Sequence, residues 1–296
     1  MTQSPETLAP SPPFKVGPYS LDGFSLGGVE TVIHLPELRL AIDVGRGPTS
    51  LIRCDHLALT HTHMDHVGGL PYLLALRQLY RMPPPTIYAP AQMAEALRDM
   101  LTAFEKVQRY PLAGPIVPTA SGEAVSLSPQ VSLVPFRTYH PIPSNGYTVV
   151  LEKKRLKAEL RALAGHEIAA MKRAGEAIEE IVKEDVLSVT GDTLVEVLEL
   201  QPHILEHDTL LMECTFLDGK KSLVDARAGG HVHLDELMER AHLFKNRRLI
   251  LSHTSQLHRP DEVVDKLKPL AARISGELWA FPMEPGRPIV RVPRGD

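Results

Sequence analysis

The order of apolar and polar positions along the chain predicts short strands that alternate with helices. Apolar runs bounded by turn residues are typical of strands, and they occur at 31–35, 38–43, 56–60, 86–89, 131–138, 147–151, 186–190, 209–213 and 249–252. Apolar residues at helical spacing occur at 70–81, 92–109, 234–244 and 261–271. This mixture predicts an α/β layered sandwich with sheets inside and helices outside.

Two segments differ in character from the rest. The first 20 residues are rich in Pro, Ser and Thr and are expected to form a loose tail, followed by one domain over 21–296. Within that domain, 153–185 is polar, helical in propensity and poor in core residues, which indicates an inserted arm. Between 153 and 173 the arm has seven Lys or Arg against two Glu.

Composition excludes several classes of protein. No apolar run reaches the 18 or so residues of a membrane helix, and 1–13 holds neither Lys, Arg nor an apolar block, so we expect a cytoplasmic protein without a secretory signal. Two cysteines cannot build a disulfide framework. The net charge of −4 leaves only a local patch, such as the arm, to bind a polyanion. The glycines at 45 and 47 lack the Lys-Ser/Thr of a phosphate loop, so no nucleotide cofactor is expected.

The main chemical signal is the run His-x-His-x-Asp-His at 61–66. Neutral imidazoles and carboxylates are ligands of Zn²⁺ and similar ions, and this run offers His61, His63, Asp65 and His66. The alternative is a capped turn before a helix, with Asp65 accepting backbone N–H groups. Burying three imidazoles and a carboxylate without a shared cation would be costly, which favours the metal site.

Three further candidate ligands, His140, Asp192 and His253, come at the ends of apolar strands. Strand ends on one edge of a sheet can converge on one point. Five imidazoles and two carboxylates suit two divalent ions about 3.5–4 Å apart, with Asp192 as the bridging carboxylate. These ligand types suit Zn²⁺, Mn²⁺ or Fe²⁺.

The motifs resemble those of the metallo-β-lactamase fold and, more narrowly, of short-form ribonuclease Z, the tRNA 3′-processing endonuclease. The stretches that carry the resemblance are 25–31, 60–71, 156–168, 191–193 with 212–216, and 230–233. The resemblance implies a four-layer αββα sandwich with a protruding helical arm. It also implies a metal-dependent endoribonuclease that removes the 3′ trailer of precursor tRNA and leaves a 3′-OH. Two divalent ions, taken as Zn²⁺, and a homodimer are implied as well.

The resemblance also assigns roles to residues. Asp65 would orient the attacking hydroxide, His231 would be the cationic donor to the phosphoryl oxygens, and Glu213 would hold His231 protonated; on spacing alone His233 is a near-equal candidate. The arm would grip tRNA through its cations, the alternative being a solvated helical insertion. These cations are Lys153, Lys154, Arg155, Lys157, Arg161, Lys172 and Arg173. The chain departs from the family where an Arg-Tyr pair is replaced by Leu257 and His258.

Two other functions remain open at this point. One is a small-molecule hydrolase of the same superfamily, acting on a thioester, a lactone or a phosphodiester. The other is a non-catalytic RNA-binding protein that holds a metal.

Overall fold

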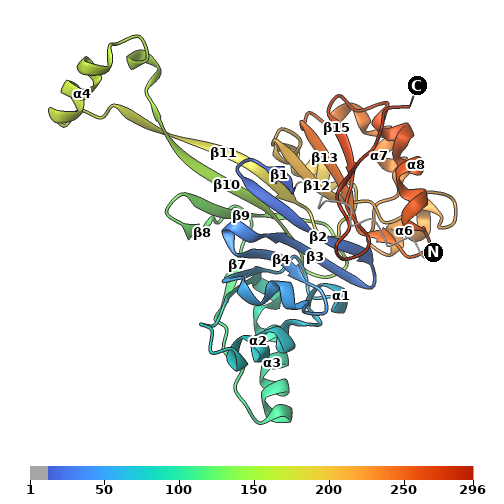
Figure 1. Cartoon of the computed structure of the whole chain (residues 1–296). Helices are drawn as coiled ribbons and strands as arrows, with labels where there is room; N and C mark the ends of the chain where they lie inside the picture. Colours follow the sequence, from blue (N-terminus) through green and yellow to red (C-terminus); the bar gives the residue numbers. More distant parts are fainter. Residues whose placement is uncertain (1–12, 296) are drawn as a thin grey trace, which may run out of the picture.

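A computed structural model describes residues 13–295, and its centre is a pair of eight-stranded sheets (Figure 1). The first sheet has the order β1 (Phe14–Val16), β2 (Tyr19–Gly27), β3 (Glu30–Leu35), β4 (Leu40–Val44), β5 (His56–Ala58), β6 (Thr86–Pro90) and β7 (Ile116–Thr119), and β14 (Thr254–Ser255) pairs with β2. The second sheet has the order β16 (Val290–Arg291), β15 (Glu277–Ala280), β13 (Arg248–Ser252), β12 (Thr209–Glu213), β11 (Glu179–Val189), β10 (Asn145–Leu156), β9 (Val131–Arg137) and β8 (Val125–Ser128).

Helices cover the outer face of each sheet. The first sheet carries α1 (Met64–Val67), α2 (Leu70–Leu79) and α3 (Ala94–Gln108), and the second carries α5 (Val197–Leu200), α6 (Leu223–Ala228), α7 (Leu234–Glu239) and α8 (Pro260–Ala271). Short 3₁₀ turns occur at Pro36–Leu38, Thr49–Arg53, Ala91–Met93, Ala158–Leu160, Pro202–Leu205 and Ala241–Leu243. None of the helices in the described range is both long and apolar enough to cross a bilayer.

Three apolar clusters correspond to the three interfaces between layers. The middle cluster joins the two sheets, with Ile33 and Ile42 from the first and Leu187 from the second. A second cluster packs α2 and α3 on the first sheet, and a third packs α7 and α8 on the second. The four-layer αββα sandwich is therefore confirmed.

The helix α8 illustrates how the sequence builds an outer layer. Pro260 occupies the first turn, where its missing N–H costs no hydrogen bond. Val263, Leu267 and Leu270 are buried, and their spacing of three or four residues places them on one face against the second sheet. Acidic residues in the first turn complement the helix dipole.

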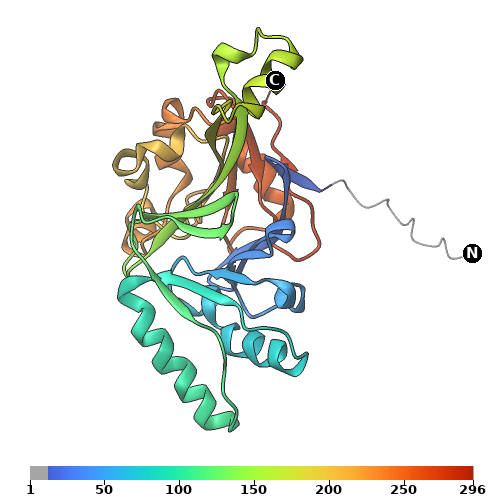
Figure 2. The same ribbon diagram turned by 90° about the vertical axis from the view of Figure 1, so that its left-hand side faces the viewer.

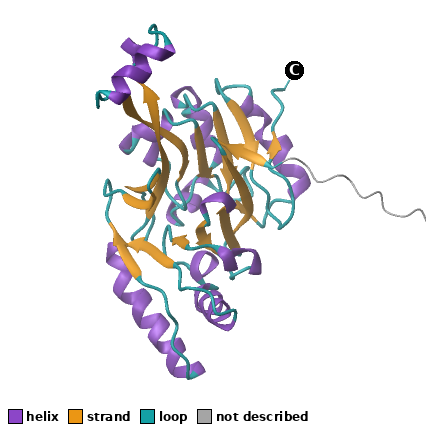
Figure 3. Cartoon of the chain, turned by 60° about the vertical axis from the view of Figure 1, so that its left-hand side comes forward, coloured by secondary structure: helices purple, strands orange, loops and turns teal. Residues whose placement is uncertain are grey.

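The arm projects from the second sheet, and its base is a pair of β-strands rather than helix. β10 and β11 pair in antiparallel register from Tyr147↔Val189 out to Leu156↔Glu179, so the sheet itself continues into the arm. Only the tip is helical, with α4 (Gly165–Arg173) (Figure 3). The helical arm predicted from composition is thus corrected to a hairpin with a helical tip. The arm and α3 lie at opposite ends of the molecule (Figure 2).

The regular structure also begins before the expected boundary at residue 21. β1 pairs with the start of β2, from Phe14↔Leu21 to Val16↔Tyr19, and the Phe14 ring packs edge-on against Trp279 at 4.8 Å. The remainder of the predicted tail, 1–12, lies outside the described residues.

Candidate metal centre

The seven predicted ligands follow strands that end at one edge of the molecule. β9, β11, β12 and β13 run in one direction, and His140, Asp192 and His253 come after the first, second and fourth of them. The run 61–66 follows β5, and Thr60 O accepts a hydrogen bond of 2.8 Å from Asn145 N. Gly191 permits this approach, because its φ is +61° and a Cβ there would lie 2.6 Å from the Thr60 side chain.

These residues form two adjoining groups, and within each group the candidate ligand atoms all lie within 4.8 Å of one another. They are His61, His63, His140 and Asp192 in one group and Asp65, His66 and His253 in the other. Asp192 reaches both, with Oδ2 3.6 Å from His61 Nε2 and Oδ1 3.4 Å from His253 Nε2. The geometry therefore brings together all seven residues and places Asp192 between the groups.

The buried atoms at this centre fit divalent cations. His66 Nε2 and Asp192 Oδ1 are buried and have no hydrogen-bond partner in the described part of the chain. Such atoms are costly to bury unless a ligand satisfies them. Burial lowers the pKa of His61 and of His140, which keeps both imidazoles in the neutral form that binds metals. Burial alone would raise the pKa of Asp192, but the surrounding imidazoles lower it well below its ordinary value, so the carboxylate is ionised.

Neighbouring oxygens fix the orientation of four imidazoles. Nδ1–H of His66 donates to Asp43 at 2.7 Å, and Nδ1–H of His140 donates to Gly230 O at 3.0 Å. Nδ1 of His61 contacts Thr60 Oγ1, and Nδ1 of His253 contacts Thr215 Oγ1, both at 3.0 Å. In each ring Nε2 faces the centre, where the Nε2 atoms of His61 and His140 both lie 3.1 Å from His63 Nδ1. Support of Nδ1 by an oxygen is how proteins set the tautomer of a metal-binding histidine.

The sequence analysis missed Asp43 and its role. Asp43 is fully buried and accepts hydrogen bonds from Thr60 N, Thr60 Oγ1 and His66 Nδ1 at 2.7–2.8 Å. Its φ of +59° is unusual for a non-glycine residue, and His253 shares that value. A signal was present in the sequence, since Asp43 ends the apolar run 38–43 just as Asp192 follows another.

His231 and Glu213 lie beside Asp192. Glu213 is 1% exposed and accepts hydrogen bonds from Thr193 N, Thr215 Oγ1 and Val232 N. His231 Nδ1 is 3.2 Å from Glu213 Oε1 and 3.9 Å from Asp192 Oδ2. Burial opposes protonation of His231, but the carboxylates, Glu213 foremost, raise its pKa to about 9. Together with Asp192 and His253, it also forms a third group of possible ligand atoms within 4.8 Å.

The competing candidate, His233, faces elsewhere. Its Nδ1 accepts a hydrogen bond from Asp235 N at 3.2 Å, and its Nε2 donates to Asp218 O at 3.1 Å. Both ring nitrogens are thus occupied at the start of α7. His258, in the departure from the family pattern, accepts a hydrogen bond from Leu217 N at 3.1 Å and is buried, whereas Leu257 is 46% exposed.

The seven arm cations fall into two groups. Lys153 and Arg155 both pair with Glu184 on the adjacent strand. The others form no ion pair within residues 13–295, and they are Lys154, Lys157, Arg161, Lys172 and Arg173.

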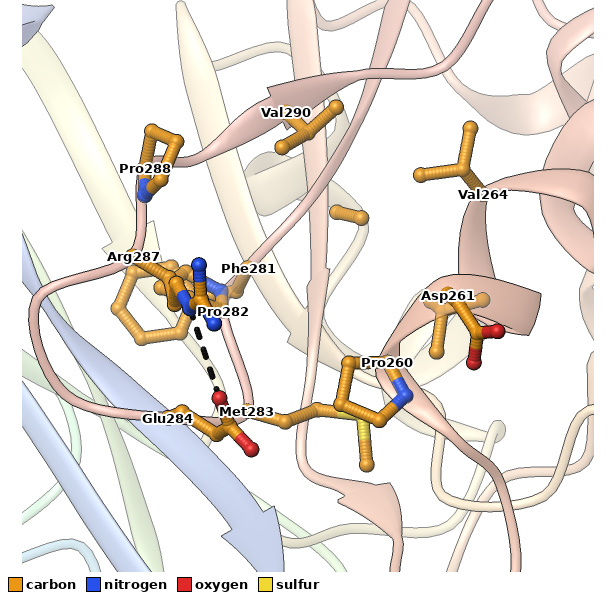
Figure 4. Close-up of a pocket in the computed structure, with 12 residues that line it drawn as sticks. Pro260, Asp261, Val264, Phe281, Pro282, Met283, Glu284, Arg287, Pro288 and Val290 are labelled. Atoms are coloured by element: carbon orange, nitrogen blue, oxygen red, sulfur yellow. Dashed lines mark ion pairs between the residues drawn. The ribbon is translucent and has the colours of Figure 1, made fainter. Parts of the chain in front are cut away.

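A hollow of about 340 Å³ lies apart from the metal centre, between α8 and the C-terminal strands (Figure 4). Apolar side chains such as Val264 and Phe281 line it, and Glu284 and Arg287 pair at 3.5 Å on its rim. None of the predicted ligands lines this hollow.

The two-sheet sandwich and its histidine- and aspartate-rich edge define a protein of the metallo-β-lactamase superfamily. Residues 39–254 match the family described as a β-lactamase superfamily domain. The chain belongs, within that superfamily, to the ribonuclease Z (tRNase Z) family. It is 36% identical to tRNase Z TRZ1 of Arabidopsis thaliana over 265 residues. This alignment covers 89% of this chain and 95% of that protein.

Solved structures share the fold. The human short-form tRNase Z (ELAC1) superposes with a TM-score of 0.54 at 21% identity, covering 81% of this chain and 93% of that one. The metallo-β-lactamase fold protein YhfI from Bacillus subtilis superposes with a TM-score of 0.60 at 16% identity, covering 89% and 96%.

Proposed function

We propose that this protein is a metal-dependent endoribonuclease that removes the 3′ trailer from precursor tRNA. The observation that carries the proposal is the 36% identity to a tRNase Z over nearly the full length of both chains. The cluster of seven candidate ligands supports it, because every member is present and lies at one edge. Hydrolysis breaks the P–O3′ bond, so the tRNA keeps a 3′-OH and the trailer keeps the phosphate.

The metal ligands in this proposal are His61, His63, Asp65, His66, His140, Asp192 and His253. The chemistry that two divalent cations supply at such a site is a lower pKa of water and neutralisation of charge on the phosphoryl oxygens. We take Zn²⁺ as the ion, in keeping with the imidazole-rich set. Measurement of metal content in the purified protein tests both the identity and the number of ions.

Three side chains act on the reacting atoms or hold those that do. Asp65, whose Oδ2 already accepts a hydrogen bond from Gly28 N at 3.0 Å, accepts a second one from the attacking water and aims it at phosphorus. His231, as a cation, donates to a phosphoryl oxygen as charge develops there. Glu213 holds His231 in the protonated form, which its short contact and the raised pKa support.

The arm supplies the grip on the RNA. Phosphate binding needs unpaired cations, so we assign it to the five arm residues without ion pairs and expect Lys153 and Arg155 to brace the hairpin instead. β10 has 12 residues, and at about 3.3 Å per residue its far end, which carries the helical tip of the arm, lies roughly 35–40 Å from its start beside the centre. We further propose a homodimer, in which the arm of one subunit serves the site of the other, and a cytoplasmic location.

Mapping of the cut site on a precursor tRNA tests the function. Lys157 N donates to Ile178 O at 3.0 Å, so an Asn-Gly turn in place of residues 158–177 can close the shortened hairpin without disturbing its strands. The full chain should cut at the 3′ end of the mature tRNA. The shortened chain should bind the precursor more weakly yet hydrolyse methyl p-nitrophenyl phosphate at the same rate. Hydrolysis of the small phosphodiester alone by the full chain would refute the proposal.

A further inference from the structure

A groove beside the metal centre has the features of a nucleotide subsite. It encloses about 730 Å³, and its lining includes His140 and Gly230, the two residues joined by the 3.0 Å hydrogen bond at the edge of the centre. The opposite wall comes from the turns after β6 and β7, with Gln92 and Ser121 exposed there. An RNA strand bound at the centre therefore has room for a nucleotide on this side.

The charge of the groove suits an anion. Its lining contains Arg137 and Arg227 but no Asp or Glu, although the protein as a whole has a net charge of −4. Arg227 is already neutralised, since its guanidinium pairs with Glu196 and with Glu236. Arg137 is exposed and forms no ion pair within the described residues, which leaves it as the available cation of the groove.

Arg137 is also placed to contact a base. Its guanidinium lies over the Tyr139 ring, 5.4 Å from the ring centroid. Backbone contacts fix the position of Tyr139, because its N–H donates to Thr193 Oγ1 at 3.0 Å and its O accepts from Leu194 N at 2.7 Å. A guanidinium stacked on a held aromatic ring presents a flat cationic surface, and unpaired bases stack on such surfaces.

We propose that this groove binds the unpaired nucleotide that flanks the scissile phosphate, with Arg137 on Tyr139 as the platform for its base. This inference rests on the proposed function and adds a subsite to it. Arg137 is a binding residue here, separate from the metal ligands and from His231. Because the platform touches the substrate only beyond the reacting phosphodiester, its loss affects RNA and spares a small ester.

Arg137→Ala tests the subsite, and Arg53→Ala is the matched control. Arg53 is also exposed and lies before β5, at the end of that strand away from the centre. Loss of one stacked base should lower kcat/KM for precursor tRNA about tenfold, which corresponds to about 1.4 kcal/mol. The same variant should hydrolyse methyl p-nitrophenyl phosphate at the wild-type rate and keep its metal content, and Arg53→Ala should match the wild type on both substrates.

The outcomes separate this inference from the function on which it rests. If the wild type does not cut precursor tRNA, the proposed function fails. If the wild type cuts and Arg137→Ala cuts equally well, or if Arg137→Ala slows both substrates alike, the subsite is refuted. As a direct readout, 2-aminopurine replaces the nucleotide on each side of the cut in turn. Quenching of the 2-aminopurine fluorescence that depends on Arg137 at one of the two positions supports the platform. If no such quenching occurs at either position, the platform is refuted.

Discussion

Asp43→Asn is the sharpest test of how this centre is organised. Asp43 accepts the Nδ1–H of His66 at 2.7 Å and thereby leaves His66 Nε2, a buried atom without a partner, facing the candidate ligands. Asparagine has nearly the same shape and tolerates the φ of +59° at this position, so the backbone should be unaffected. The change replaces one carboxylate oxygen by an amide that donates hydrogen bonds rather than accepting them.

The expected effect follows from the contacts of Asp43. If the new amide oxygen keeps the Thr60 N–H bond, its NH₂ group must face His66 Nδ1, which favours the tautomer with the proton on Nε2. That tautomer cannot bind a metal through Nε2. A hydrogen bond to a charged group contributes about 1.5–3 kcal/mol, and loss of such a supporting contact lowers metal affinity by about 10–100-fold.

Competition with a chromophoric chelator measures the affinity of apo protein for Zn²⁺. Asp22→Asn removes an exposed carboxylate and should bind the metal like the wild type. Thermal unfolding in excess chelator shows whether the apo fold survives in Asp43→Asn. An intact apo fold with unchanged metal affinity would refute the assigned role of Asp43.

Three further changes probe the centre and its scaffold. His231→Ala should leave the metal content intact and lower turnover of precursor tRNA by about 10²–10³-fold, as loss of a donor to developing charge does; equal loss of metal and turnover would make it a ligand instead. Asp65→Ala should abolish most cleavage, and near-normal rates would argue against its role in orienting water. Gly69→Ala should destabilise the fold, because its Cβ would lie 2.0 Å from Gly47 N and neither backbone can yield; an unchanged melting temperature would show that this contact relaxes.

The sequence singled out seven candidate ligands that the structure brings together, because their chemistry is local. Four candidates lie within 61–66, and His140, Asp192 and His253 each follow an apolar strand, so alternation alone placed them at one edge. Asp43 also ends an apolar run, but it was missed because it has no ligating neighbour in sequence. Its function depends on Thr60 and His66, which only the parallel pairing of β4 and β5 brings beside it.

The arm shows where propensity fails. Its Ala, Glu and Lys content favours helix. However, β10 and β11 extend from the core into the arm and stay paired there, and that pairing overrides the local preference for helix. The sequence analysis also assigned the same RNA-binding role to all seven cations of the arm. Glu184, distant in sequence from Lys153 and Arg155, forms ion pairs with both through this same pairing.

The strand pair β10–β11 fixes the distance between the metal centre and the tip of the arm. β10 leaves the groove at Asn145 and reaches the arm at Leu156, while β11 returns from the arm to Val189, three residues before Asp192. Two residues added to each strand would keep every side chain on its face and carry the arm outward by about 7 Å. An enzyme that measures its substrate from the arm would then shift its cut along the RNA rather than lose it.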